Sequence, residues 1–264
     1  MLLNKMLFIV LSSFLTITSQ AQSDTAHSQN PKKHHSINSN TSEFIIDFGF
    51  ANWTDNTDYS AALAQQYIVN KPGQPIFTSN DLKLKSSKSS NVNIWFFMQR
   101  LNLIKHYISL KYGLGIEMYN YRFTSSISFK EAGNNPYNSA SYISSPYLIR
   151  DSISFSKNKL AANYATVPFM INFRANPKSP SKSLSLSAGV SVGYLYNTRN
   201  KQVSSERGKQ KNHGDYGLEK WKFSYIGELG LGGARLYGSY TPASIFEKGF
   251  SLIPYSIGIR LSNW

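Results

Sequence analysis

The chain of 264 residues contains no cysteine, and its charged residues are few for its length. Without cysteine it cannot be a disulfide-stapled scaffold, hold a thiolate metal site or carry a lipoprotein anchor. After its N-terminal segment the chain never approaches the roughly 18 consecutive apolar residues of a membrane-spanning helix, so we expect none in the mature chain. Charged residues make up only 16% and aromatic residues as much as 14%, a balance typical of a β-rich envelope protein.

The first 21 residues have the three parts of a secretory signal peptide. Lys5 supplies the positive charge, residues 7–17 form a short apolar core, and Ser19-Gln20-Ala21 offers a cleavage site between small residues. We therefore expect export with cleavage near Ala21; an uncleaved anchor is the alternative. Residues 22–42 are polar and predict a disordered periplasmic leader, which leaves residues 43–264 as the folded domain.

The folded domain alternates apolar and polar residues in runs of about ten, the length of a membrane-crossing strand. Phe44, Phe48 and Phe50 share one parity, while Asp47 and Gly49 share the other. A period of two places successive side chains on opposite faces of a β-strand. One face is apolar, and the other is rich in glycine, serine and asparagine. A soluble sandwich would turn the apolar face inward, whereas a membrane barrel turns it outward to lipid.

Eight such strands are expected, joined by connections that are mostly long and short in turn. They lie at about 43–53, 91–101, 106 onwards, 160–174, 183–198, 219–230, 234–242 and 250–263. Bacterial outer-membrane barrels have an even strand number, short periplasmic turns and long external loops. The pattern therefore predicts an all-β protein: a transmembrane antiparallel β-barrel of eight strands in an up-and-down meander, located in the outer membrane.

Two local features of these strands add further expectations. The apolar parity of the third strand changes after Met118, which predicts a β-bulge there. Aromatic residues near strand ends are expected to form girdles at the membrane surfaces. These residues are Trp53, Tyr119, Tyr121, Tyr196, Trp221 and Tyr240. Trp264, at the C-terminus, resembles the aromatic signal by which barrel proteins reach their insertion machinery.

Seven charged residues have the parity of the barrel interior. They are Asp47, Lys111, Glu117, Lys222, Glu228, Arg235 and Arg260. An eight-stranded barrel has room inside for side chains but hardly for an open channel. Because both signs are present, we expect a structural network of ion pairs that offsets the cost of desolvation. The alternative is that some of these charges lie in the watery ends of the barrel without partners.

The net charge of +14 predicts an acidic partner. Basic residues concentrate in two connections, one at 83–88 and one with five members. The second set is Arg199, Lys201, Arg207, Lys209 and Lys211. For an exported chain we expect contact with lipopolysaccharide phosphates or anionic glycans, and no nucleic acid partner. The alternative is that these loops are simply solvated.

One string resembles a catalytic motif, because Gly189-Val190-Ser191-Val192-Gly193 fits G-x-S-x-G. A nucleophile elbow needs a sharp strand-to-helix turn, but here the alternation continues without a break. Ser191 is therefore expected in the interior row of a straight strand. His34-His35 lies in the polar leader, which provides no fixed geometry for a metal. We expect no catalytic residues, no cofactor and no metal site.

Several short motifs resemble the PorT-like outer-membrane β-barrel domain family. Tyr164-Ala165-Thr166-Val167-Pro168-Phe169 is similar to its Y-x-x-[IV]-P-[LF] strand, and Leu186-Ser187-Ala188-Gly189-Val190 follows at the expected distance. Further fitting segments are Asp215-Tyr216-Gly217, the glycine-rich 227–233, Tyr240 and Ile257-Gly258-Ile259. The resemblance covers roughly residues 43–264 and implies a small outer-membrane barrel. Some relatives act in a protein-secretion and gliding apparatus.

The expected function is therefore a non-enzymatic one on the cell surface. The chain would bind through long extracellular loops, or assist an envelope complex in secretion or assembly, with a lumen filled by side chains. Its expected surroundings are outer-membrane lipid and lipopolysaccharide. Two alternatives remain open at this point: a small-solute pore and an outer-membrane lipid-modifying enzyme.

Overall fold

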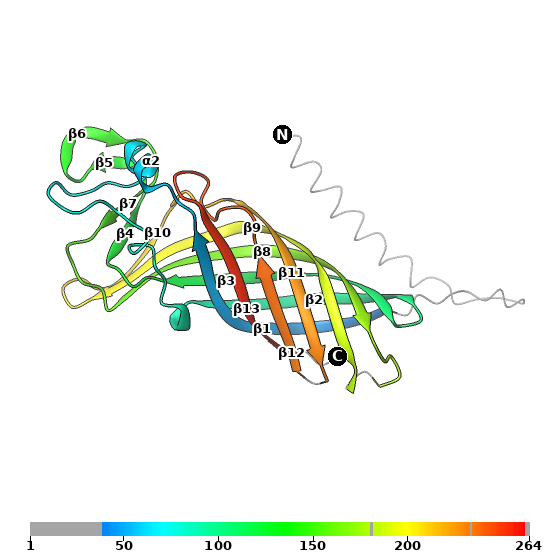
Figure 1. Cartoon of the computed structure of the whole chain (residues 1–264). Helices are drawn as coiled ribbons and strands as arrows, with labels where there is room; N and C mark the ends of the chain where they lie inside the picture. Colours follow the sequence, from blue (N-terminus) through cyan, green and yellow to red (C-terminus); the bar gives the residue numbers. More distant parts are fainter. Residues whose placement is uncertain (1–38, 180–181, 233, 262–264) are drawn as a thin grey trace, which may run out of the picture. The chain divides into compact units, whose positions relative to one another are not determined.

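The computed structural model describes residues 39–179, 182–232 and 234–261. The predicted signal peptide, most of the predicted leader and Trp264 lie outside these residues. Eight long strands dominate the described chain (Figure 1). They are β1 (Ser39–Asp55), β2 (Ser90–Ile104), β3 (Ile108–Arg122), β8 (Lys157–Arg174), β9 (Leu184–Ser204), β11 (Trp221–Leu231), β12 (Ala234–Tyr240) and β13 (Leu252–Leu261).

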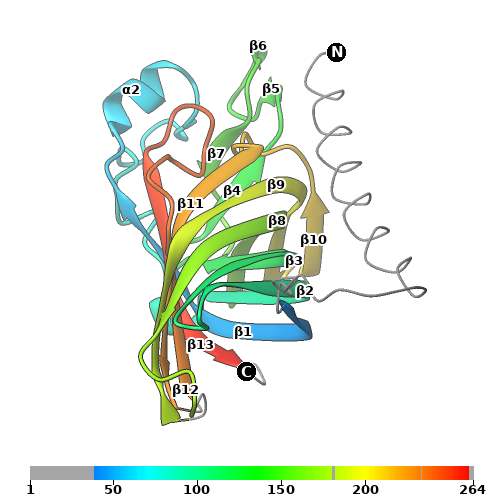
Figure 2. The same cartoon turned by 90° about the vertical axis from the view of Figure 1, so that its right-hand side faces the viewer.

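Each of these strands pairs antiparallel with the next one along the chain, and the last returns to the first. The closing seam runs from Ile46 opposite Leu261 to Asp55 opposite Leu252. Closure leaves no unpaired edge in the membrane, where water cannot satisfy one. The predicted eight-stranded up-and-down meander is confirmed (Figure 2). The first strand begins at Ser39, so the last residues of the predicted leader belong to the barrel wall.

The connections differ sharply between the two ends of the barrel. Short turns join β2 to β3, β8 to β9 and β11 to β12, whereas long connections at the other end carry additional elements. These elements are helix α2 (Tyr59–Ala64), the 3-10 helix η1 (Ser86–Lys88), β4 (Ile127–Lys130), β5 (Gly133–Asn135), β6 (Asn138–Ile143), β7 (Tyr147–Arg150) and β10 (Gly208–His213). We call the four long connections, residues 56–89, 123–156, 205–220 and 241–251, the head. Among the described residues no helix is long and apolar enough to cross a membrane.

An apolar belt surrounds the barrel on its outward face. On β8 the side chains that face outward are each about half exposed: Val167, Phe169, Ile171 and Phe173. The residues that alternate with them, such as Thr166 and Met170, face inward and are buried. The belt on this strand covers roughly the 9–11 residues that a tilted strand needs to cross a bilayer. This outward apolar face with a polar interior matches a membrane barrel and is opposite to a soluble sandwich.

Above the belt the polarity of the two faces reverses. The alternation of β3 continues without a break, so Tyr119 and Tyr121 keep the inward parity of Glu117. The predicted bulge in this strand is therefore wrong; β2 carries a bulge between Trp95 and Phe97 instead. Once the wall leaves the lipid, water lies outside, and the apolar side chains turn inward as in a soluble protein.

The prediction that aromatic residues near strand ends form membrane girdles is wrong for three of these residues. Trp53, Tyr119 and Tyr121 are buried in the interior above the belt, with the Trp53 and Tyr121 rings 4.6 Å apart. Tyr196 and Tyr240 are about half exposed on the outward face, as a girdle position requires.

The head folds around a core of its own. The ring of Phe129 lies 5.5 Å from that of Phe123, 5.7 Å from that of Tyr216 and 6.3 Å from that of Phe246, so three connections meet in one aromatic cluster. The loops are also joined by hydrogen bonds and charge. Arg150 donates to both carboxylate oxygens of Asp81, at 2.6 and 2.7 Å, and this pairing raises the pKa of Arg150. The head is therefore an ordered structure rather than a set of independent loops.

Candidate functional site

The seven predicted interior charges are all buried inside the barrel. Their exposed fractions are 0% for Asp47, 2% for Lys111 and Glu117, 5% for Lys222, 3% for Glu228, 6% for Arg235 and 8% for Arg260. They form two groups at different heights in the lumen. One group gathers around Arg260 and Glu228, and the other joins Lys222 to Glu117.

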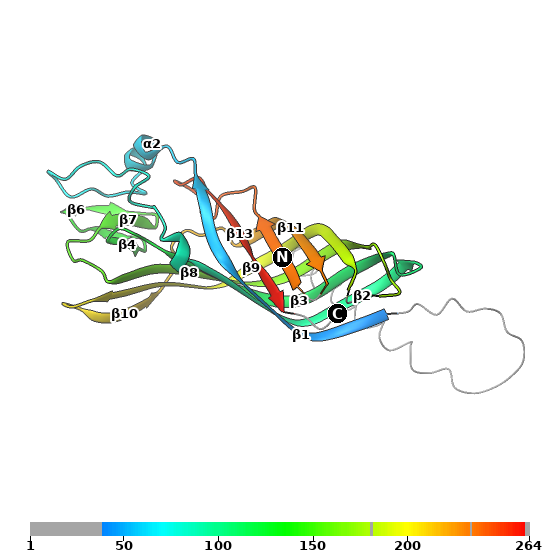
Figure 3. The same cartoon turned by 60° about the horizontal axis from the view of Figure 1, so that its bottom comes forward.

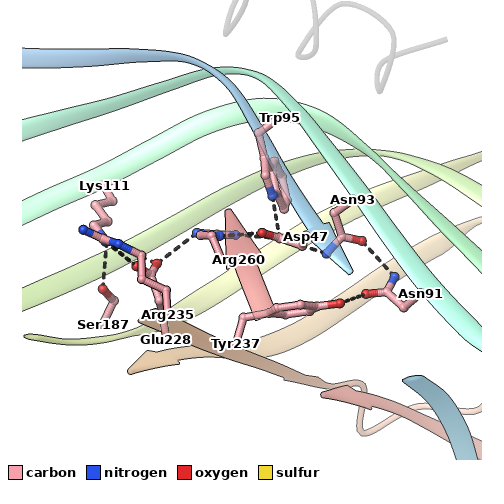
Figure 4. A network of polar contacts seen from close by, with 10 residues as sticks. All are labelled: Asp47, Asn91, Asn93, Trp95, Lys111, Ser187, Glu228, Arg235, Tyr237 and Arg260. Carbon is pink, nitrogen blue, oxygen red and sulfur yellow. Dashed lines mark hydrogen bonds and ion pairs between the residues drawn. The ribbon is translucent and has the colours of Figure 1, made fainter. Parts of the chain in front are cut away.

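Arg260 is the centre of the larger group (Figure 4). Its Nε and Nη2 donate to the two carboxylate oxygens of Asp47, at 2.7 and 2.8 Å. Asp47 on β1 lies directly opposite Arg260 on β13, so the closing seam itself brings the pair together. The remaining Nη1 of Arg260 reaches Glu228 at 2.9 Å. One guanidinium therefore links both acids of this group, using the planar fork that suits carboxylates.

Glu228 also forms ion pairs with two cations from other strands of the barrel. Lys111 on β3 crosses the lumen to its two oxygens at 3.0 and 3.1 Å, and Arg235 on β12 reaches it at 2.9 Å. Lys111 also donates to Ser187 at 3.1 Å. These contacts tie four strands together through side chains in addition to the backbone ladder.

A chain of neutral donors completes the shell around Asp47. Trp95 Nε1 donates to its carboxylate at 2.8 Å and Asn93 Nδ2 at 3.1 Å. Asn91 donates to Asn93 at 2.8 Å and accepts from the Tyr237 hydroxyl at 2.5 Å. Sequence reasoning missed these residues, although Asn91, Asn93 and Trp95 share the interior parity of β2 and could have been found by it.

Two glycines make room for that tyrosine across the closing seam. Gly49 and Gly258 face each other between Asn91 on β2 and Tyr237 on β12. A Cβ on Gly49 would stand 2.5 Å from the Tyr237 hydroxyl oxygen, and one on Gly258 would stand 2.7 Å from its ring. The absence of side chains at this pair lets the ring lie over the seam and reach Asn91.

The second group lies where the barrel interior changes from charged to aromatic. Lys222 forms a close ion pair with Glu117 and donates to the Tyr119 hydroxyl at 3.0 Å. Its ammonium lies 4.6 Å from the Tyr119 ring centroid and 5.2 Å from that of Tyr164. A cation held by one carboxylate and two aromatic faces is well compensated for its loss of water.

Ion pairs in both groups cross the barrel interior between different strands. The cavity between the residues around Asp47, Glu117 and Arg260 has a volume of about 20 Å³. That volume suits a single water molecule. The chemistry available here is mutual neutralisation of fixed charges.

Four of the five predicted basic-loop residues share one outward surface. Strand β10 pairs with the end of β9 that reaches into the head (Figure 3). Lys201 on β9 lies directly opposite Lys211 on β10, and Arg199 and Lys209 have the same parity. Arg207 is separate, because it lies in the turn and pairs with Asp151 at 3.1 Å.

The catalytic-looking serine lies in the middle of β9. Ser191 is buried inside the barrel opposite Ser224 and Pro168, and its hydroxyl has no hydrogen-bond partner. His213 pairs with Arg199, eight residues further along β9, which corresponds to roughly 26 Å of strand. The described residues hold no cluster of three or more histidine, aspartate or glutamate side chains that could bind a metal.

A cleft of about 130 Å³ opens in the head where all four long connections meet. Tyr67, Tyr147 and Tyr216 supply aromatic walls, and Glu247 and Lys248 bring both signs of charge to it. Aromatic faces beside polar groups are typical of ligand clefts.

A search of curated proteins finds no match. Among solved structures, the chain resembles the crystal structure of Ail, the attachment invasion locus protein of Yersinia pestis, at 12% identity; the match covers 84% of this chain and 98% of that chain, with a TM-score of 0.29. The profile of a family described as outer membrane protein beta-barrel domain matches residues 20–243. Because this match spans most of the chain, the protein belongs to that family and resides in the outer membrane.

Proposed function

We propose that this protein is a non-enzymatic surface-binding module, in which the head binds an extracellular ligand and the barrel is a closed anchor. One observation carries the proposal: the four long connections fold into a single head with its own core and a shared cleft. Side chains fill the lumen below it. Loops that are held in place by a rigid scaffold commonly bind ligands.

A narrower assignment to the PorT-like family, with an accessory role in an envelope complex, rests on the sequence motifs. In the fold, two of these motifs pack side by side, with Phe169 opposite Val190 and Met170 opposite Gly189. A Cβ on Gly189 would stand 2.0 Å from the Phe169 carbonyl oxygen. The motif residues thus serve the close approach of β8 and β9, which supports a shared barrel architecture.

The two rival functions have less support. A pore needs continuous open space, whereas ion pairs cross the lumen at Glu228 and at Glu117. A hydrolase needs an exposed nucleophile beside its base, whereas Ser191 is buried and lies far along the strand from His213.

Photo-crosslinking in intact cells tests the proposal. A photoreactive residue at Tyr142 or Ile76, exposed by 64% and 61% in the head, should capture a defined extracellular ligand. The same residue at Leu103, exposed by 58% beside the short turn at the opposite end, is the matched control. Capture at Leu103 alone would contradict the proposal and favour an assembly role through the periplasmic side.

A further inference from the structure

We propose that the outward face of β3, β8, β9 and β10 above the apolar belt binds the phosphate groups of lipopolysaccharide in the outer leaflet. This basic wall has seven cations: Arg122, Lys157, Lys159, Arg199, Lys201, Lys209 and Lys211. The inference goes beyond the proposed function of the head, because it concerns the side of the molecule and not the cleft.

Strand register aligns four of these cations in one row. Arg122 lies opposite Lys159, Lys159 opposite Lys201, and Lys201 opposite Lys211. Side chains at directly opposite positions point to the same face with Cβ atoms about 5 Å apart, and like charges there are destabilising. Three consecutive like-charged pairs therefore carry a cost that an anionic ligand would remove.

Adjacent residues do not neutralise this row. The outward positions of the four strands above the belt hold asparagine, alanine, valine and His213 besides the cations, and no acidic side chain among the described residues. None of the wall cations takes part in an ion pair within the described chain. Arg122 and Arg199 each keep a buried Nε without a hydrogen-bond partner.

The electrostatics of Lys159 reflect this crowding. Burial together with the surrounding cations Lys157, Arg199, Lys201 and Arg122 lowers its pKa to about 8. The pKa of Lys201 is lowered as well, by burial and then by its basic neighbours. A bound phosphate would favour the charged form of both groups.

The position of the wall identifies lipopolysaccharide rather than a soluble polyanion. On β8 the outward side chains pass from Val167 in the belt through Asn163 to Lys159 and Lys157 on one continuous face. A bulge at Tyr196 brings Arg199 and Lys201 of β9 onto that same face. Lys159 lies eight residues from Val167 on this face, roughly 26 Å of strand. An amphiphile whose acyl chains cover the belt would therefore have its phosphorylated polar part on the side of the belt where the cations lie.

The test measures binding of purified lipopolysaccharide to the detergent-solubilised full barrel, by native mass spectrometry, with intact and enzymatically dephosphorylated material. Lys159→Gln, Lys201→Gln and Lys211→Gln together remove three wall cations. The matched control removes three cations from the head, through Lys83→Gln, Lys85→Gln and Lys88→Gln. Heat-modifiable migration on a denaturing gel establishes that both variants are folded.

We expect the parent and the control to retain phosphorylated lipopolysaccharide, and the wall variant to bind it at least tenfold more weakly. Each cation near an anionic surface contributes a factor of about five, so three would exceed that threshold. Equal binding of dephosphorylated material, equal loss in both variants or no loss in the wall variant would overturn the proposal. So would tight binding of a soluble acidic polysaccharide with none of lipopolysaccharide. Crosslinking from Tyr142 tests the head separately.

Discussion

Replacing Arg260 by methionine is expected to lower the free energy of unfolding by about 3–5 kcal/mol, because the change leaves a buried carboxylate without its cation. Asp47 is fully buried and has Arg260 as its ion-pair partner, supported by the neutral donors Trp95 and Asn93. Glu228 would still form ion pairs with Lys111 and Arg235, so losing Arg260 should destabilise its carboxylate less than that of Asp47. The measurement is urea unfolding of the barrel in lipid vesicles, followed by heat-modifiable migration.

A second variant separates charge from packing at this site. Adding Asp47→Asn to Arg260→Met removes the orphaned charge and keeps an oxygen for Trp95 and Asn93, so much of the loss should return. Arg207→Met is the surface control, because Arg207 is half exposed and its pair with Asp151 should contribute less than about 1 kcal/mol. If Arg260→Met unfolds like the parent, the lumen is wet and these charges are solvated.

Replacing Tyr121 by alanine is expected to open the head while the membrane belt stays folded. Tyr121 is 1% exposed and packs against Trp53 and Tyr119, with ring centroids 4.6 and 5.8 Å away. Removing a buried aromatic side chain costs about 3–5 kcal/mol. Tyr121 belongs to the aromatic cluster that also contains the head core, so its removal should destabilise the head. Trypsin should then cleave the long connections, at Lys83 and Lys130 among other sites, at a much lower concentration than it needs in the parent.

Phe169→Ala is the matched control for the head. Phe169 is 51% exposed on the outward face of the belt and touches lipid rather than the head core. Its loss should leave the tryptic pattern of the head unchanged. If the two variants are cleaved alike, the aromatic interior above the belt does not support the head.

The strands were predictable because alternation is a local property of the sequence. The parity of Phe169 and Ile171 identified the lipid face of β8, and the order of the strands followed from loop lengths. Closure of a meander also brings Asp47 to Arg260, because the first and last strands must meet. The contact of Lys111 with Glu228 crosses the lumen between non-adjacent strands, and parity alone carries no information about such a partner.

The reversal of polarity above the belt could not be predicted in the same way. If apolar residues face lipid along the whole strand, Tyr119 and Tyr121 predict a change of phase, whereas these side chains in fact point into the barrel interior. The position along β3 at which lipid gives way to water is set by the neighbouring strands and by the head above the barrel. A wall that passes from lipid to water changes which face is apolar without any change in backbone geometry.

Single-channel recording in planar bilayers tests the central claim, that ion pairs close the lumen beneath a folded head. The parent protein, refolded and inserted at a density confirmed by heat-modifiable migration, should show no steady conductance steps at either polarity. The lateral contacts of Arg260, Lys111 and Lys222 occupy the path that ions would need. Stable, reproducible openings of the unmodified protein would contradict the claim and favour the small-solute pore.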